Sequence, residues 1–143
     1  MPEILVRNAQ RKIPVAAREL QDFAERALQL CLAESTRPGS VLGTLEQITV
    51  LLVSDRRIAA LHREFMNIAG ATDVITFHDG DIFISTETAR RQADQFGTSF
   101  DDELRLYIVH GLLHLHGFDD QSAAELRRME AVQGRVYAAA RGS

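Results

Sequence analysis

Apolar side chains recur at intervals of three and four residues along five stretches of the chain, and this spacing predicts amphipathic helices. Serine or threonine residues stand before several of these stretches, where they can cap a helix N-terminus. Phe65, Phe96 and Leu126 fall on faces predicted to pack inward. The first predicted helix has Pro14 in its first turn and ends before the loop at 37–40. The second begins at Ser54 and ends at about 69–70, and the third begins at Ser85 or Thr86 and ends at Gly97. The fourth begins at Thr98 or Ser99 and ends at Gly117, and the fifth spans 122–138.

Short runs rich in β-branched and other apolar residues separate these helices and predict strands. In the run at 46–53, Ile48, Val50 and Leu52 alternate with Thr49, Leu51 and Val53, which is typical of a well-buried strand. An Asp-Gly pair at 79–80 favours a tight hairpin turn between the last two runs. The predicted strands are 3–7, 46–53, 73–77 and 81–85.

The length of 143 residues is that of one domain, and no repeat or low-complexity tract interrupts it. We therefore expect a single domain over 1–143. No apolar run approaches about 18 residues and the N-terminus lacks a basic segment, so we expect no signal peptide, no membrane span and a cytoplasmic protein. The single cysteine, Cys31, excludes an intramolecular disulfide and is predicted to be a buried thiol.

Acidic residues outnumber basic residues by 20 to 16, which gives a formal net charge of -4. This balance argues against a protein that binds nucleic acid through a large overall excess of positive charge. Any contact with nucleic acid must therefore be local, and Arg56, Arg57 and Arg63 are the candidates for it. No DNA partner is expected.

The segment 104–115 is apolar on nearly every side, which predicts a central buried helix. It nevertheless contains His110 and His114, and a buried imidazole needs a hydrogen-bond partner or a metal ion. Positions four apart lie on one helix face, so both rings can converge on one cation. Two hydrogen-bonded core histidines are the alternative explanation.

A third ligand can come from just beyond this helix. Gly117 can adopt a positive φ and turn the chain so that Asp119 and Asp120 return toward the histidines. The spacing does not choose between the two carboxylates, and a solvated acidic turn explains them too. His116 lies about 200° round the helix from His114 and is predicted to lie on the surface or behind the ligands.

The segment 110–120, His-Gly-Leu-Leu-His-Leu-His-Gly-Phe-Asp-Asp, resembles the signature of the YbeY family of metal-dependent endoribonucleases. The resemblance extends over about 46–137. It implies an α+β fold with a small mixed sheet of about four strands, flanked by about five helices, and a metal site at the end of the buried central helix. The other matching blocks, in the same order, are Thr72 to Phe77, Gly80 to Ser85, Gln92-Ala93 and Glu103-Leu104.

The same resemblance implies one zinc ion per chain, held by His110, His114 and the residue at position 120. There the family has a third histidine and this chain has Asp120, a carboxylate that is also a good zinc ligand. A family arginine that follows an aromatic residue aligns with Met66, so Arg63 or Arg57 would have to stabilise developing charge instead. His62, at a family asparagine, is either a polar group near the cleft or an exposed helix residue.

The implied function is that of a single-strand-specific, zinc-dependent endoribonuclease in ribosomal RNA maturation and ribosome quality control. His110, His114 and Arg63 are its expected catalytic residues, and the expected partners are single-stranded or ribosomal RNA and the ribosome or its assembly factors. A catalytically weakened ribosome-assembly factor that keeps the metal site is the alternative. A zinc peptidase fits less well, because Gly111 occupies the place of the glutamate that serves as its general base.

Overall fold

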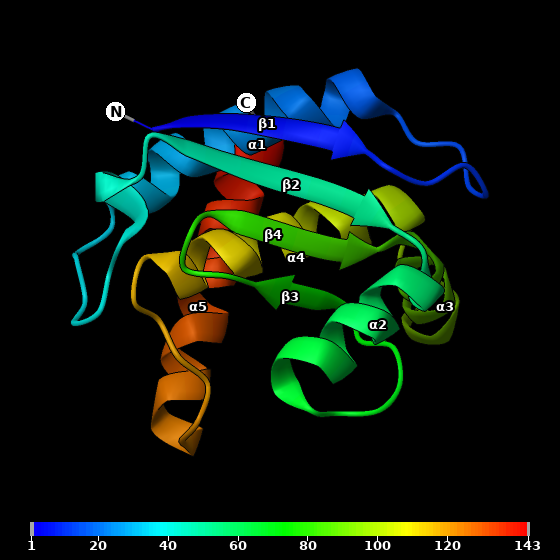
Figure 1. Cartoon of the computed structure of the whole chain (residues 1–143). Coiled ribbons are helices and arrows are strands. Elements are labelled where there is room, and N and C mark those ends of the chain that lie inside the picture. Colours follow the sequence, from blue (N-terminus) through cyan, green and yellow to red (C-terminus); the bar gives the residue numbers. More distant parts are fainter. Residues whose placement is uncertain (1, 143) are drawn as a thin grey trace.

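Four strands form one mixed sheet in the computed structural model, which describes residues 2–142. The strands lie in the order β1-β2-β4-β3 (Figure 1). β2 pairs in parallel with both β1 and β4, whereas the short edge strand β3 is antiparallel to β4. The mixed four-stranded sheet expected from the sequence is therefore confirmed. The strands span Glu3–Asn8 (β1), Gln47–Val53 (β2), Val74–Thr76 (β3) and Asp81–Ser85 (β4).

Five α-helices and one short 3-10 helix complete the described part of the chain, which confirms the α+β class. A serine side chain caps the N-terminus of every α-helix except α1, and the capping serines before α3 and α4 are Ser85 and Ser99. None of the helices in residues 2–142 is long and apolar enough to cross a membrane. The helices are Ala17–Ala33 (α1), Leu42–Thr44 (3-10), Asp55–Met66 (α2), Thr86–Phe96 (α3), Phe100–Leu115 (α4) and Ala123–Arg141 (α5).

The two faces of the sheet are covered by different helices. Alternate residues of β2, such as Val50 and Leu52, join the main core with α1, α4 and α5. Val53 on the opposite face packs in a smaller cluster with Ile58 of α2 and Ile75 of β3. Successive side chains of a strand point to opposite faces, and β2 is apolar at every position from Val50 to Val53 because it is covered on both.

Helix α4 lies at the centre of the larger core, as the sequence predicts. Leu104, Ile108 and Leu112 on it are fully buried. Gly111 allows α4 to approach β4 closely, since a Cβ atom built there would lie 2.8 Å from Cγ2 of Ile82. The α1 residue Cys31 is also fully buried, and burial with the nearby charge of Glu34 raises the pKa of its thiol to about 12.

Three details of the predicted helices are wrong. The first helix begins at Ala17, because the Gln10 side chain bonds the backbone N–H and carbonyl of Ile13 and holds the chain in a bend just before Pro14. Phe65 and Phe96 are 60% and 63% exposed, since each lies in the last turn of its helix, beyond the edge of the core. Leu126, near the start of α5, is also exposed.

The contact at Gly111 predicts opposite effects for two Gly→Ala substitutions. Gly111→Ala forces a methyl group against Ile82, so we expect the free energy of unfolding to fall by about 1 to 2 kcal/mol despite the gain in helix propensity. Gly134→Ala in α5 meets no atom within 4 Å and is expected to raise that free energy by up to about 1 kcal/mol. Denaturant unfolding measures both. Equal stabilisation by the two changes would contradict the close packing of α4 on β4.

Candidate metal centre

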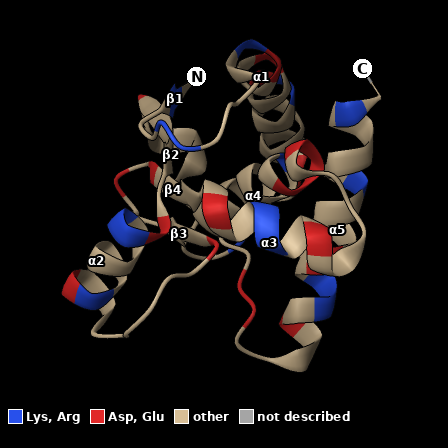
Figure 2. Cartoon of the chain, turned by 90° about the vertical axis from the view of Figure 1, so that its right-hand side faces the viewer, with Lys and Arg blue, Asp and Glu red and all other residues tan. Residues whose placement is uncertain are grey.

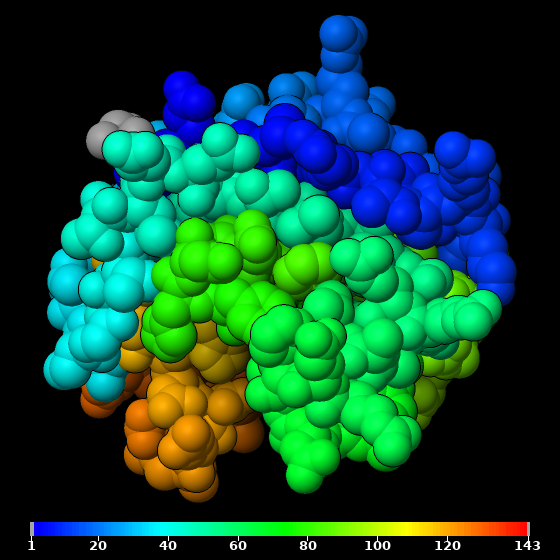
Figure 3. All heavy atoms as spheres, viewed as in Figure 1, coloured from blue at the N-terminus to red at the C-terminus, as the bar shows by residue number. Residues whose placement is uncertain are grey.

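A cleft of about 890 Å³ opens at the C-terminal end of α4, and we call it the main cleft. In Figure 3 it is the hollow between the green surface of α2 and the orange segment that leads into α5. Its walls are the strand β3, the residues at the end of α2 and the loop that follows α4. His110, His114 and Asp120 all line it.

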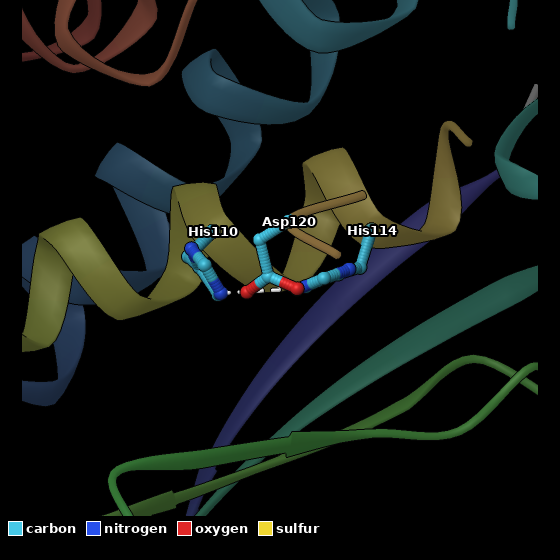
Figure 4. A group of neighbouring side chains, drawn as sticks. All are labelled: His110, His114 and Asp120. Carbon is cyan, nitrogen blue, oxygen red and sulfur yellow. Dashed lines mark hydrogen bonds between the residues drawn. The ribbon is translucent and has the colours of Figure 1, made fainter. Parts of the chain in front are cut away.

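The two histidines present their Nε2 atoms to each other across one face of α4. The Nε2 atoms of His110 and His114 are 3.0 Å apart, and the ring planes are nearly perpendicular, at 79°. Figure 4 shows both rings pointing to the same side of the helix. The predicted convergence of the two imidazoles is therefore present in the structure.

A glutamine of α5 sets the protonation of His110. Nδ1 of His110 lies 2.8 Å from Oε1 of Gln133. A carbonyl oxygen only accepts hydrogen bonds, so Nδ1 carries the proton and Nε2 of His110 presents a bare lone pair to the main cleft. Partners of this kind orient imidazole ligands in metal sites.

The turn after α4 delivers the third group. Gly117 has φ +95°, and a Cβ atom there would lie 2.9 Å from the carbonyl oxygen of Arg37. Phe118 is buried, and its N–H donates to the carbonyl of Leu113, which fixes the direction of the returning chain. The expectation of a positive φ at Gly117 is confirmed, and the reason is both the turn and the close approach of the neighbouring loop.

Asp120 is the carboxylate that this turn brings to the histidines. One oxygen of Asp120 and one nitrogen of each imidazole all lie within 4.8 Å of one another (Figure 4). Asp119 instead accepts a hydrogen bond from the backbone N–H of Asp120 through Oδ1. Of the two candidates that the sequence left open, Asp120 shares the cluster with His110 and His114.

The cluster fits a metal ion in both donor type and geometry. Two imidazole nitrogens, each about 2.0 to 2.1 Å from a tetrahedral zinc ion, would be about 3.3 Å apart, close to the 3.0 Å between the Nε2 atoms. Burial and, to a lesser extent, the neighbouring His110 ring lower the pKa of His114, against the opposing effect of Asp120 and Asp119. A neutral imidazole is the form that binds a metal. The three residues therefore could hold one cation with a side open to the main cleft.

His116 differs from one of the sequence expectations. It is buried, with 3% of its surface exposed, so its placement on the surface is wrong. Its Nδ1 contacts Oγ of Ser40 at 3.1 Å, and its Nε2 contacts the carbonyl of Glu34 at 2.9 Å. His116 therefore ties the end of α4 to the connection between α1 and β2. The angle between positions 114 and 116 around the helix predicts that His116 points away from the ligands. It does not predict the contacts with Ser40 and Glu34.

The residues of α2 divide between the main cleft and solvent. Met66 lines the cleft, whereas Arg63 is exposed and is not among the lining residues that the structure describes. Nδ1 of His62 lies 3.0 Å from the carbonyl of Gly70, so this ring fastens the loop after α2. The catalytic role expected for Arg63 stays a prediction.

Gln133 was missed by sequence reasoning. It follows His110 by 23 residues on a separate helix, and only the packing of α5 against α4 brings the two together. No local spacing pattern marks such a partner.

Thr72 and Asp73 also line the main cleft, where Oδ1 of Asp73 accepts hydrogen bonds from the Val74 N–H and the Thr72 hydroxyl.

Several known proteins are similar to this chain. A protein from Bacteroides thetaiotaomicron is 38% identical over 66% of this chain and 74% of its own length, and one from Thermus thermophilus is 41% identical over 64% and 74%. A protein from Geobacter metallireducens is 31% identical over 95% of this chain and 94% of its own length. All three are named endoribonuclease YbeY.

A solved structure and a family model extend the similarity to nearly the whole chain. The solution structure of TM1509 from Thermotoga maritima superposes with a TM-score of 0.62 at 22% identity, covering 97% of this chain and 92% of that one, and so shares the fold. The family model described as endoribonuclease YbeY matches residues 5–141. That span includes most of the sheet, the five described α-helices and the His-His-Asp cluster, and the chain belongs to the YbeY family.

Proposed function

We propose that this chain is an endoribonuclease that holds one zinc ion with His110, His114 and Asp120. One observation carries the metal part of the proposal: the lone pair of His110 Nε2, fixed by Gln133, faces a second imidazole nitrogen 3.0 Å away, beside a carboxylate. An acceptor fixed this close to a second imidazole nitrogen and a carboxylate favours a cation among the three groups. The names of the relatives support the activity on RNA.

The chain's own groups prepare the site for phosphodiester hydrolysis. When bound, the zinc ion would supply Lewis-acid chemistry and lower the pKa of a water molecule. Three protein donors leave room for that chemistry, because a purely structural zinc site is normally closed by four. Gln133 keeps the proton of His110 on the side away from the main cleft. A concave cleft of about 890 Å³ suits splayed, unpaired nucleotides, and this supports the proposal of a single-stranded RNA substrate.

The RNA backbone needs local positive charge, because the chain as a whole is acidic. Arg56, Arg57 and Arg63 are exposed on α2, and no ion pair within residues 2–142 involves them. Figure 2 shows the basic segments of α2 across from the acidic loop that precedes α5. The family has an arginine where this chain has Met66. We propose that Arg63 takes the role of that arginine and stabilises the negative charge of the phosphate.

The cellular role that we propose follows the family. The substrates are ribosomal RNA precursors or defective ribosomal RNA, the partners are the ribosome or its assembly factors, and the site of action is the cytoplasm. The structure disfavours a peptidase, since Gly111 faces Ile82 of the sheet and a glutamate side chain has no room there. A nonenzymatic assembly factor remains as one outcome of the activity test below.

Substitutions at Asp120 test the ligand set. Asp120→Ala removes one of three donors and is expected to lower zinc affinity by about 10- to 100-fold or more, whereas Asp120→His restores an imidazole donor and recovers the affinity. Competition with a chromophoric chelator measures both. Asp119→Ala is the matched control and is expected to bind zinc within a few-fold of the parent. If Asp120→Ala binds zinc as the parent does, Asp120 is not a ligand.

An activity assay distinguishes the three candidate functions. We expect the zinc-loaded protein to cleave labelled single-stranded RNA and to leave casein intact, and we expect His114→Ala and chelator-treated protein to lose the cleavage by at least about 100-fold. Gel electrophoresis of the products measures this. Cleavage of casein would support a peptidase, and metal binding without cleavage of either substrate would support the assembly factor.

Arg63 can be tested by salt dependence. Arg63→Ala is expected to weaken binding of single-stranded RNA and to reduce the slope of log affinity against log salt by about 0.7, the value for one phosphate contact. Zinc affinity should not change. Lys12→Ala, which removes an exposed charge that pairs with Glu87 in the first turn of α3, outside both cleft linings that the structure describes, is the control. An unchanged slope in Arg63→Ala would exclude the proposed phosphate contact.

A further inference from the structure

A second cleft of about 290 Å³ lies beside the proposed metal centre, between α3, α4 and α5. It shares Asp73, Val74 and His110 with the main cleft. His110 therefore separates two adjoining spaces, with its Nε2 toward the other metal-binding groups and its Nδ1 toward Gln133, which lines the second cleft. An RNA strand that passes the metal would have a neighbouring nucleotide next to this second cleft.

Two amide groups of the second cleft are held in fixed orientations. The hydroxyl of Tyr107 donates to Oε1 of Gln92, and Nδ1 of His110 donates to Oε1 of Gln133. Burial raises the pKa of Tyr107 far above its usual range, so its hydroxyl remains a donor. Both amide oxygens are therefore occupied. Within residues 2–142 neither amide nitrogen has a hydrogen-bond acceptor, so each is free to donate to a ligand.

An aromatic ring stands at the same cleft. Phe96, the last residue of α3, is 63% exposed although it lines the cleft. Leu106 lines it as well, so part of the wall is apolar. An exposed phenyl face beside polar donors is the combination on which unpaired bases stack in proteins that bind single-stranded RNA.

The charges in the second cleft favour a base over a phosphate group. No lysine or arginine lines it within the described residues, whereas Asp73 and Glu103 do. Two carboxylates repel a phosphate but not a neutral ring. A planar, uncharged ligand with hydrogen-bond acceptors on its edge therefore fits the lining residues better than the sugar-phosphate backbone does.

We propose that the second cleft binds one unpaired nucleobase of the RNA, next to the phosphate that is cleaved, with Phe96 stacking on the ring and Gln92 and Gln133 donating to its edge. This inference rests on the proposed endoribonuclease function. Uracil and cytosine each carry two hydrogen-bond acceptors on one edge, one for each amide. Adenine carries a single ring-nitrogen acceptor beside its amino donor on that edge, so only one amide can donate to it and the cleft favours the pyrimidines.

Matched variants on α3 test the proposal. Gln92→Glu keeps an oxygen for the Tyr107 hydroxyl but replaces the amide donor with an acceptor, and Gln95→Glu adds the same charge at an exposed position outside both clefts. Phe96→Ala removes the stacking ring, and Phe96→Trp retains one. Gln133 is left intact because it orients His110.

Binding is measured first, without metal, by fluorescence anisotropy with labelled oligouridine, oligocytidine and oligoadenosine of equal length. We expect the parent and Gln95→Glu to bind oligouridine and oligocytidine at least about 5-fold more tightly than oligoadenosine. Gln92→Glu should lose that preference, and Phe96→Ala should weaken oligouridine binding about 5- to 10-fold while Phe96→Trp does not. The added negative charge repels all three oligomers equally, so it does not change the ratio of their affinities.

Cleavage of a mixed-sequence RNA by the zinc-loaded protein then gives a separate readout. The parent should cut beside pyrimidines, and Gln92→Glu should spread the cuts to sites beside adenine. Binding preferences and cut sites that are the same in the parent, Gln92→Glu and Phe96→Ala would overturn the second cleft as a base site while leaving the endoribonuclease intact. Base-dependent binding without any cleavage would instead refute the proposed function and keep the base site. A parent that binds none of the oligomers refutes the base site.

Discussion

The close packing of α4 on β4 is the constraint on which the site depends. Gly111 lies between His110 and His114, and its missing side chain lets the helix press against Ile82. One face of α4 is therefore buried against the sheet. His110, one position before Gly111, and His114, three positions after it, line the main cleft. A larger residue at 111 would lift the helix and carry both imidazoles with it. The glycine that argues against peptidase chemistry is thus also the residue that positions the metal site.

The cluster of His110, His114 and Asp120 has its ligand atoms close together before any ion binds. Nδ1 of His110 donates to Gln133, so Nε2 of His110 is an acceptor 3.0 Å from Nε2 of His114. Without a cation, a neutral His114 ring can donate the proton on its Nε2 to this acceptor. A cation in the proposed site would replace that proton and contact both nitrogens and the Asp120 carboxylate. The side chains therefore need little rearrangement to bind an ion.

Much of the fold was predictable from the sequence because its signals are local. The strand alternation in β2, the capping serines and the apolar stripe of α4 each depend on neighbours within one element. The exposure of Phe65 and Phe96 was not predictable, since periodicity shows which side of a helix is apolar but not where the core beneath it ends. For the site, spacing brought His110 and His114 together, and the turn at Gly117 indicated an acidic third group. The choice of Asp120 and the contact of Gln133 depended on tertiary packing.

The burial of His116 connects the metal-binding loop to a distant part of the chain. Its two ring nitrogens contact Ser40 and Glu34, and the adjoining Gly117 faces the carbonyl oxygens of Arg37 and Pro38. The connection between α1 and β2 and the loop that carries Asp120 thus share one set of contacts, and opening either one breaks them. Segments coupled in this way open as one cooperative unit. The time that an ion would stay in the proposed site is consequently governed in part by the stability of a connection that lies far earlier in the chain.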